Sequence, residues 1–158
     1  MKLMDVLKTE FIRIPLQSND KESVIQELID LLYSHKVCGS PQKVFEAVMA
    51  REKIMTTGVG RMVAIPHCKR SDCPEFAIAL GIHPEGVDYQ SIDNLPARII
   101  FLLVGPESNP GMHIRLLSRI SRLISKDSLR DGLLNCKTAE EAFELLKKEE
   151  DKYFEIAS

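Results

Sequence analysis

Hydrophobic residues recur along much of the chain at the three- and four-residue spacing of amphipathic helices. One helix begins after Asn19 or Asp20, with Glu22 placed to close a capping box, and ends before Gly39. The Ser40-Pro41 pair is a typical helix start and opens a second helix, which closes at Arg51-Glu52. The same spacing predicts a third helix from about Asn109-Pro110 and two short ones over 128–136 and 139–150, the last capped by Thr138.

Between these helices lie short apolar runs that are typical of strands. They are expected over 11–16, 63–65, 76–82 and 97–104, with turns at 83–86 and 93–96. Pro15 places the first strand at a sheet edge, and the continuous run over 97–104 is the expected central strand, covered on both faces. Strands interleaved with helices predict an α/β fold of three layers, α/β/α, with a small mixed sheet between the helices.

Composition limits the function classes without choosing among them. With 158 residues, 44% of them hydrophobic, the chain can form one globular domain over 1–158. A net charge of -2 predicts no general attraction to nucleic acid or to an anionic membrane. The four cysteines, at 38, 68, 73 and 136, have no disulfide-framework spacing, and we find no signal peptide or membrane-length apolar run, so a cytoplasmic protein with reduced thiols is expected.

A polar, glycine-containing stretch leads into the apolar run that ends at His67, our candidate for the chemistry. Pro66 holds the preceding residue extended and offers no backbone donor, so a strand should stop here and leave His67 facing a cleft. Gly58-Val59-Gly60, next to Thr57, is either a set of backbone donors around an anion or simply a turn that needs positive φ. It lacks the lysine and Ser/Thr of a P-loop.

His113 and Arg51 add to this candidate site. His113 is expected on the buried face at the start of the third helix, after the central strand, where the helix adds partial positive charge. Arg51 is either a cation near the histidines or a solvated helix end. Two histidines, a glycine turn and an arginine are suited to attaching and holding an anionic phosphoryl group, because neutral imidazole is a nucleophile and cationic groups offset phosphoryl charge.

Three other functions fit parts of the sequence. Cys68 is a possible hydrolase nucleophile with His113 as base, since the adjacent His67 points the opposite way on an extended segment. Cys68, Cys73 and His83 form a weak zinc pattern, because a second paired element is missing. A basic stripe on the third helix is either solvated or a binding module for an acidic protein partner, and comprises Arg115, Arg119, Arg122 and Lys126.

The residues over 44–54, the Thr57-Gly58-Val59-Gly60 and Val63-Ala64-Ile65-Pro66-His67 segments, 91–96 and 113–120 together resemble a known family. It is the enzyme IIA domain of the fructose/mannitol class of the bacterial phosphoenolpyruvate-dependent sugar phosphotransferase system, which includes the nitrogen-regulatory IIA proteins. The resemblance implies that His67 is phosphorylated, on Nε2, by the histidine phosphocarrier protein. It matches His113 to a second active-site histidine and Arg51 to an arginine near the phosphorylated ring.

The same resemblance implies a phosphotransferase that needs no metal or organic cofactor and passes its phosphate to a IIB domain or regulates a target protein by its phosphorylation state. Thr57, Gly58 and Gly60 are the expected phosphate-binding residues beside Arg51. Met62 replaces a glycine that the family usually has, and it cannot adopt positive φ cheaply, so a differently shaped turn is expected. Arg61 is expected to add positive charge at the site, and the 51–53 and 92–94 stretches favour the regulatory branch slightly.

Overall fold

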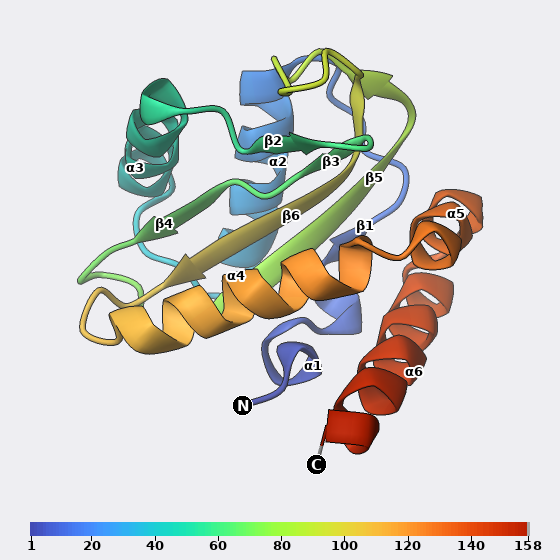
Figure 1. Cartoon of the computed structure of the whole chain (residues 1–158). Helices are drawn as coiled ribbons and strands as arrows, with labels where there is room; N and C mark the ends of the chain where they lie inside the picture. Colours follow the sequence, from blue (N-terminus) through green and yellow to red (C-terminus); the bar gives the residue numbers. More distant parts are fainter. Residues whose placement is uncertain (158) are drawn as a thin grey trace.

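A computed structural model of the chain describes residues 1–157, with side chains through residue 153, as three layers around one sheet (Figure 1). The helices are α1 Leu3–Val6, α2 Lys21–Ser34, α3 Pro41–Ile54, α4 Pro110–Ile124, α5 Asp127–Asn135 and α6 Ala139–Ala157, with a 3-10 turn at Thr9–Phe11. The strands are β1 Ile12–Arg13, β2 Gly58–Gly60, β3 Val63–Ala64, β4 His67–Lys69, β5 Ala77–Val87 and β6 Ala97–Gly105. None of the helices within 1–157 combines the length and apolar character needed to cross a membrane.

The sheet is mixed, and β6 is its central strand, as the sequence predicted. The strand order is β1-β5-β6-β3-β2, and β4 also pairs with β6, beyond the end of β3. β5 and β2 pair antiparallel with β6 and β3 respectively, whereas β3 and β4 run parallel to β6 and β1 runs parallel to β5. β1 lies at an edge, as expected, but it ends before Pro15, whose nitrogen carries no hydrogen for a ladder bond.

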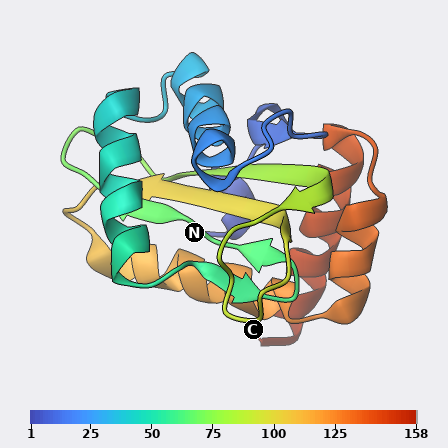
Figure 2. The same cartoon turned by 90° about the horizontal axis from the view of Figure 1, so that it is seen from above.

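Helices cover both faces of the sheet, which confirms the predicted α/β/α layers. α2 and α3 lie on one face and α4 on the other, with α5 and α6 beside α4 at one end of the sheet (Figure 2). Side chains of β6 alternate between the two cores: Ile99, Phe101 and Leu103 pack with α4, α5 and α6, and Ile100, Leu102 and Val104 pack with α2 and α3. Burial on both faces explains the continuous apolar run of this strand.

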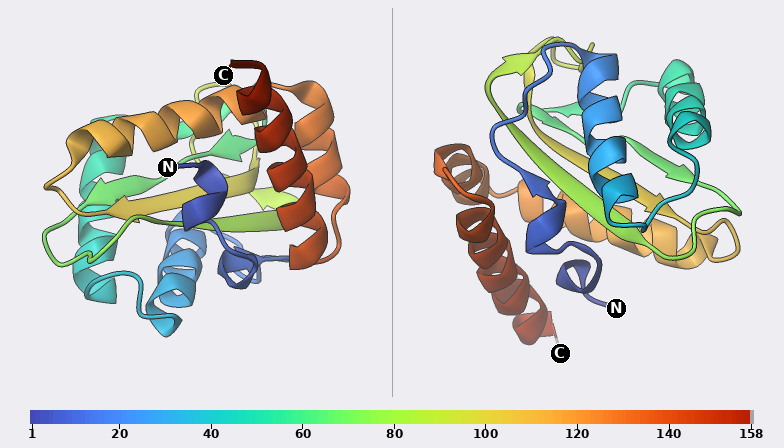
Figure 3. Two further views of the ribbon diagram at one scale, coloured as in Figure 1. Left: turned by 90° about the horizontal axis from the view of Figure 1, so that it is seen from below. Right: turned by 180° about the vertical axis from the view of Figure 1, so that it is seen from behind.

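The two ends of the chain meet on the α4 face. α1 lies beside α6 (Figure 3), and the buried carboxylate of Glu150 accepts the backbone N–H groups of Leu3 and Met4 at 2.6 and 3.1 Å. α6 is longer than the predicted 139–150, and the side chain of Thr138 accepts the N–H of Glu141 at its start, as its expected capping role requires.

Two local predictions near helix and strand ends were wrong. At the start of α2 the cap is Asp20, which accepts the N–H of Ser23, so Glu22 does not sit at the capping-box position. Residues 83–86 do not end a strand: β5 runs through them with a shift of register, and the N–H of Gly86, which has φ 92°, bonds Nδ1 of His83 at 2.8 Å. A buried histidine thus supplies the acceptor that a turn would have supplied by its backbone.

The glycine stretch before His67 agrees with its prediction only in part: Gly60 has the expected positive φ, 94°, but the turn itself lies after the stretch. Gly58–Gly60 is a strand, and the turn follows it at Arg61 and Met62, where the chain crosses to β3. Both turn residues have positive φ, 55° and 66°, so Met62 adopts the conformation that its side chain disfavours. The two-residue connection between Gly60 and Val63 requires that conformation, and the hairpin pairing imposes it on Met62.

Candidate active site

His67, His113 and Arg51 line one cleft of about 360 Å³, although they are far apart in sequence. They come from β4, α4 and α3, that is, from the sheet and from a helix on each of its faces. The cleft is completed by Ala47, Cys68, Lys69, Ile114 and Leu117. The structure therefore brings together the three residues for which the sequence predicted chemistry.

His67 is held by the backbone on both sides of it. β3 ends at Ala64, before Ile65-Pro66, as the proline predicted, but His67 then begins a new strand that pairs with β6 opposite Leu103. The carbonyl of Pro66 accepts the N–H of Leu103 at 3.0 Å, so the ladder continues past the proline. Nδ1 of the His67 ring lies 2.8 Å from the carbonyl oxygen of Ile65. Because a carbonyl only accepts, Nδ1 carries the proton of a neutral ring and Nε2 keeps a free lone pair.

The environment of His67 favours its neutral form. Burial lowers the pKa of the imidazole, the bond to Ile65 opposes this in part, and the positive charge of Arg51 lowers the pKa further. A neutral ring with a free Nε2 is the form of histidine that attacks an electrophile.

His113 faces His67 and has no hydrogen-bond partner on either ring nitrogen among the described residues. The two ring centroids are 5.6 Å apart with planes inclined at 57°, and the side chain of His113 lies in the buried first turn of α4. Burial, and then the charges of His67 and Lys69, lower its pKa to about 4, so the ring is neutral at pH 7. A neutral imidazole has one donor and one acceptor nitrogen, so His113 can hydrogen-bond a polar group in the cleft.

Two cations supply positive charge. The guanidinium of Arg51 lies at the last turn of α3, where it donates to the carbonyl of Met55 at 2.8 Å. Lys69 was missed in the sequence analysis, although it lies two residues after His67 on an extended segment and therefore projects from the same face of the strand. The two-residue spacing from His67 is the sequence signal that could have identified Lys69.

The predicted phosphate-binding residues before the hairpin are not among those that line the cleft. The hydroxyl of Thr57 is buried against Glu52 and Tyr89. A side chain at Gly58 would collide with Ser91, so this glycine permits close packing of a neighbouring loop. Gly60 and Arg61 lie beside the end of α4, away from the histidines, so the expectation that Arg61 adds charge to the site was wrong.

Comparison with known families assigns the chain. Residues 5–149 match the family model described as phosphoenolpyruvate-dependent sugar phosphotransferase system, EIIA 2. The chain belongs to this family. The resemblance inferred from the sequence is thereby confirmed, and it now covers most of the chain.

Relatives within the EIIA 2 family carry two kinds of name. A fructose-specific EIIABC component of the phosphotransferase system from Bacillus subtilis is 32% identical over 92% of this chain, which spans only 23% of that protein. A nitrogen regulatory protein from Pseudomonas aeruginosa is 30% identical over 84% of this chain and 86% of its own length.

Solved structures of similar proteins share the fold. Nitrogen regulatory protein IIA-Ntr from Neisseria meningitidis superposes with a TM-score of 0.84 at 31% identity, covering 90% of this chain and 97% of that one. The complex of enzyme IIAMTL with phosphorylated enzyme IIBMTL from Escherichia coli gives 0.78 at 20% identity, over 90% and 99% of the two chains. At 20% identity, the likeness to IIAMTL shows the fold alone.

The structure of this EIIA 2 domain does not support the hydrolase or the zinc site. The thiol of Cys68 is buried, which raises its pKa to about 12, and it makes no hydrogen bond to His113. A thiol that stays protonated is a poor nucleophile. His83 already bonds Ser18 and Gly86 through its two nitrogens, and no group of three or more His, Cys, Asp or Glu side chains in the described part of the chain is placed to hold a metal ion.

The basic stripe on α4 is partly used within the molecule. Arg119 lies 3.8 Å from the carboxylate of Glu150, and Lys126 lies 2.9 Å from that of Glu149. Arg119 therefore helps to hold α6 against α4, and Lys126 helps to hold it against the start of α5, which leaves less charge for an acidic partner.

Proposed function

We propose that this EIIA 2 domain is a phosphocarrier that accepts a phosphoryl group on Nε2 of His67 and passes it on. The observation that carries the proposal is the hydrogen bond from Nδ1–H to the carbonyl of Ile65, which leaves Nε2 as the one nucleophilic nitrogen of the ring. The donor is the phosphorylated histidine phosphocarrier protein, as the family resemblance implies. Enzymatic transfer through a covalent phosphohistidine divides one displacement into two.

The first step exchanges one nitrogen–phosphorus bond for another. The Nε2 lone pair of His67 attacks the phosphorus of the donor phosphohistidine, and the bond from phosphorus to the donor nitrogen breaks, with its electron pair returning to the donor ring. Nδ1–H of His67 remains bonded to Ile65 and stabilises the charge that the ring acquires. The second step reverses this sequence toward an acceptor nucleophile.

The neighbouring groups hold the transferred phosphoryl oxygens. Arg51 and Lys69 offset their negative charge, and a ring N–H of His113, which lines the same cleft, donates to one of them. Thr57, Gly58 and Gly60 do not contact the phosphoryl group. They form and pack the hairpin that precedes His67. This assignment replaces direct phosphate binding by these three residues, because they do not line the cleft.

The acceptor is a IIB domain in sugar uptake, or the phosphorylation state regulates a target protein. Membership of the EIIA 2 family and the fructose-specific relative support a IIB acceptor, and the nitrogen regulatory relatives support regulation. Identity to the fructose-specific and regulatory relatives is similar, at 32 and 30%, so we propose both roles as branches of one phosphocarrier chemistry.

Labelling with a phosphorylated carrier protein tests the proposal. We expect the wild-type protein to take up phosphate that is labile in acid and stable in alkali, and His67→Ala to take up none. His35→Ala is the matched control, because His35 is exposed and does not line the cleft, so it should retain full labelling. Label persisting in His67→Ala, or absent from the wild type with an active donor, would contradict the phosphocarrier function.

A further inference from the structure

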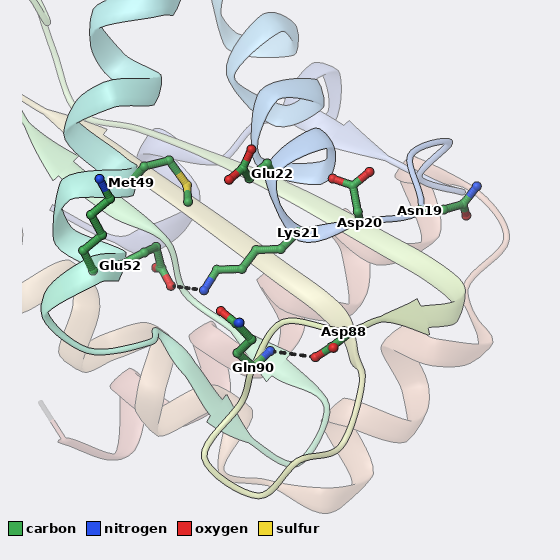
Figure 4. Close-up of a pocket in the computed structure, with 9 residues that line it drawn as sticks. Asn19, Asp20, Lys21, Glu22, Met49, Glu52, Asp88 and Gln90 are labelled. Carbon is green, nitrogen blue, oxygen red and sulfur yellow. Dashed lines mark hydrogen bonds and ion pairs between the residues drawn. The ribbon is translucent and has the colours of Figure 1, made fainter.

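A buried ion pair lies outside the cleft, and neither of its residues contacts the phosphoryl group in the proposed transfer. The carboxylate of Glu52, next to Arg51 on α3, is 2% exposed and lies 3.0 Å from the ammonium group of Lys21, which is 13% exposed (Figure 4). Both residues line a separate hollow between α2, α3 and the 88–90 segment, and neither lines the cleft that holds His67. Consecutive residues of a helix point about 100° apart, which explains why Arg51 and Glu52 serve different sites.

Both oxygens of the Glu52 carboxylate accept hydrogen bonds from Thr57. One oxygen accepts the Thr57 backbone N–H at 3.0 Å, and the other accepts the Thr57 hydroxyl in a short bond. Since that hydroxyl has only one hydrogen, the phenol of Tyr89, 3.1 Å away, must donate to the Thr57 oxygen. Burial, and then the charge of Glu52, raise the pKa of Tyr89 far above its usual value, so its proton is retained.

Thr57 in turn is bonded to the segment that orients His67. The carbonyl of Thr57 accepts the N–H of Ile65 at 3.0 Å, and the carbonyl of Ile65 accepts Nδ1–H of His67 at 2.8 Å. The hydrogen bonds therefore run without interruption from Glu52 to the imidazole. Thr57 immediately precedes β2 and Ile65 immediately follows β3, so this bond also closes the base of the hairpin.

Stability alone does not explain a buried ion pair at this place. Replacing such a pair by apolar residues of similar volume is often neutral or stabilising, because desolvation of the two charges offsets their attraction. Apolar residues cannot accept two directional hydrogen bonds from one threonine. The backbone that Glu52 bonds at Thr57 leads to the carbonyl of Ile65, which accepts the proton-bearing nitrogen of His67.

We propose that Glu52, held by Lys21, is a positioning residue that acts through Thr57 and Ile65 to keep Nε2 of His67 unprotonated and aimed into the cleft. The effect on transfer rests on the proposed phosphocarrier function, but the tautomer is a property of the unphosphorylated protein. The two are therefore measured separately.

The test compares two charge-neutral double variants. Lys21→Met with Glu52→Leu removes both acceptors without leaving an unpaired buried ammonium, whereas Lys21→Met with Glu52→Gln keeps a carbonyl acceptor for the Thr57 N–H and an amide donor for its hydroxyl. Nitrogen-15 NMR of the His67 ring reports the tautomer. We expect the leucine variant to show a mixture of Nδ1–H and Nε2–H forms and the glutamine variant to keep the Nδ1–H form.

Transfer should follow the tautomer. Phosphorylation of the leucine variant by the phosphorylated carrier protein should be roughly 10- to 100-fold slower, since a small misplacement of a reacting group has effects of that size, and the glutamine variant should recover most of the rate. Lys43→Met with Glu46→Leu is the matched control on the exposed side of α3 and should change neither readout.

An unchanged His67 tautomer in a folded leucine variant would overturn the proposal, as would the same change in the exposed control. If the leucine variant does not fold, Thr57→Val is decisive, because it keeps the ion pair and the backbone bonds and removes only the hydroxyl. It should shift the tautomer where Thr57→Ser does not, and equal tautomers in the two would again overturn the proposal. If the leucine variant shows the tautomer shift but the wild-type protein takes up no phosphate label, the phosphocarrier function is refuted and the positioning role of Glu52 is not.

Discussion

At the scale of single residues, the site depends on two neutral imidazoles in different situations. His67 has one nitrogen bonded to Ile65 and the other free, whereas His113 has both nitrogens free in a buried position. The first arrangement is suited to a nucleophile, and the second can hydrogen-bond a polar group in the cleft. Burial is the main cause that lowers the pKa of each ring, and it therefore favours the neutral form of both.

The low pKa of His113 predicts a loss of stability in mild acid. Its pKa is about 4 in the folded protein against 6.5 for an ordinary histidine, so below pH 6.5 the unfolded chain binds the proton first. The stability that the neutral ring contributes is fully present above pH 6.5 and decreases as the pH falls toward 4, by up to about 3 kcal/mol.

Urea unfolding from pH 7 to pH 4 measures this effect as a difference between proteins. His113→Phe, which cannot titrate, should lose less unfolding free energy over that range than the wild type, while carboxylates contribute equally to both. Parallel curves for the two proteins would show that His113 does not titrate as its burial requires.

At the scale of elements, the turn of the β2–β3 hairpin, which precedes His67 in the chain, has a strained backbone. Arg61 and Met62 both have positive φ in a two-residue turn, a place where glycine and asparagine are usual. The pairing of β2 with β3 and the parallel pairing of β3 with β6 require this turn, so tertiary contacts impose the conformation.

Met62→Gly should therefore stabilise the protein. Relief of the left-handed conformation outweighs the greater chain entropy of glycine, for a net gain of about 1 kcal/mol in the free energy of unfolding. Met62→Ala is the control, because alanine loses the same side-chain contacts but keeps the strain, and it should give no gain. Equal stabilisation by alanine in chemical denaturation would show that the Met62 side chain, and not its backbone, is the source of the strain.

At the scale of the whole molecule, the cleft exists only because three layers meet at one end of the sheet. His67 belongs to the sheet, Arg51 to a helix on one face and His113 to a helix on the other. Loosening either helical layer would separate groups that must act together.

The two cores should unfold as one cooperative unit. Ile25 on α2 and Ile120 on α4 are fully buried on opposite faces of the sheet, and each change to valine should cost about 0.5–1.5 kcal/mol. The double variant should lose the sum of the two within about 0.5 kcal/mol, because the side chains share no contacts. Two separate transitions in urea, followed by fluorescence and circular dichroism, would instead show that the layers unfold independently.

The amino-acid sequence by itself indicated the main helices, the central strand and the candidate reactive groups. Apolar spacing placed the helices and the central strand because burial of one helix face, or of both faces of a strand, leaves a periodic record. The segment ending in Ile65-Pro66-His67 indicated the candidate nucleophile, and His113 followed from its place at the start of a buried helix face.

Tertiary structure alone decided how these groups are used. The new strand at His67, the positive φ of Met62 and the burial of Thr57 against Glu52 all depend on pairing with residues far away in sequence, which local patterns do not record. For the same reason Gly58–Gly60, which the sequence presented as either an anion-binding loop or a turn, forms a strand. The proton on Nδ1 of His67 depends on one carbonyl held in place by the hairpin, and that is set by the fold.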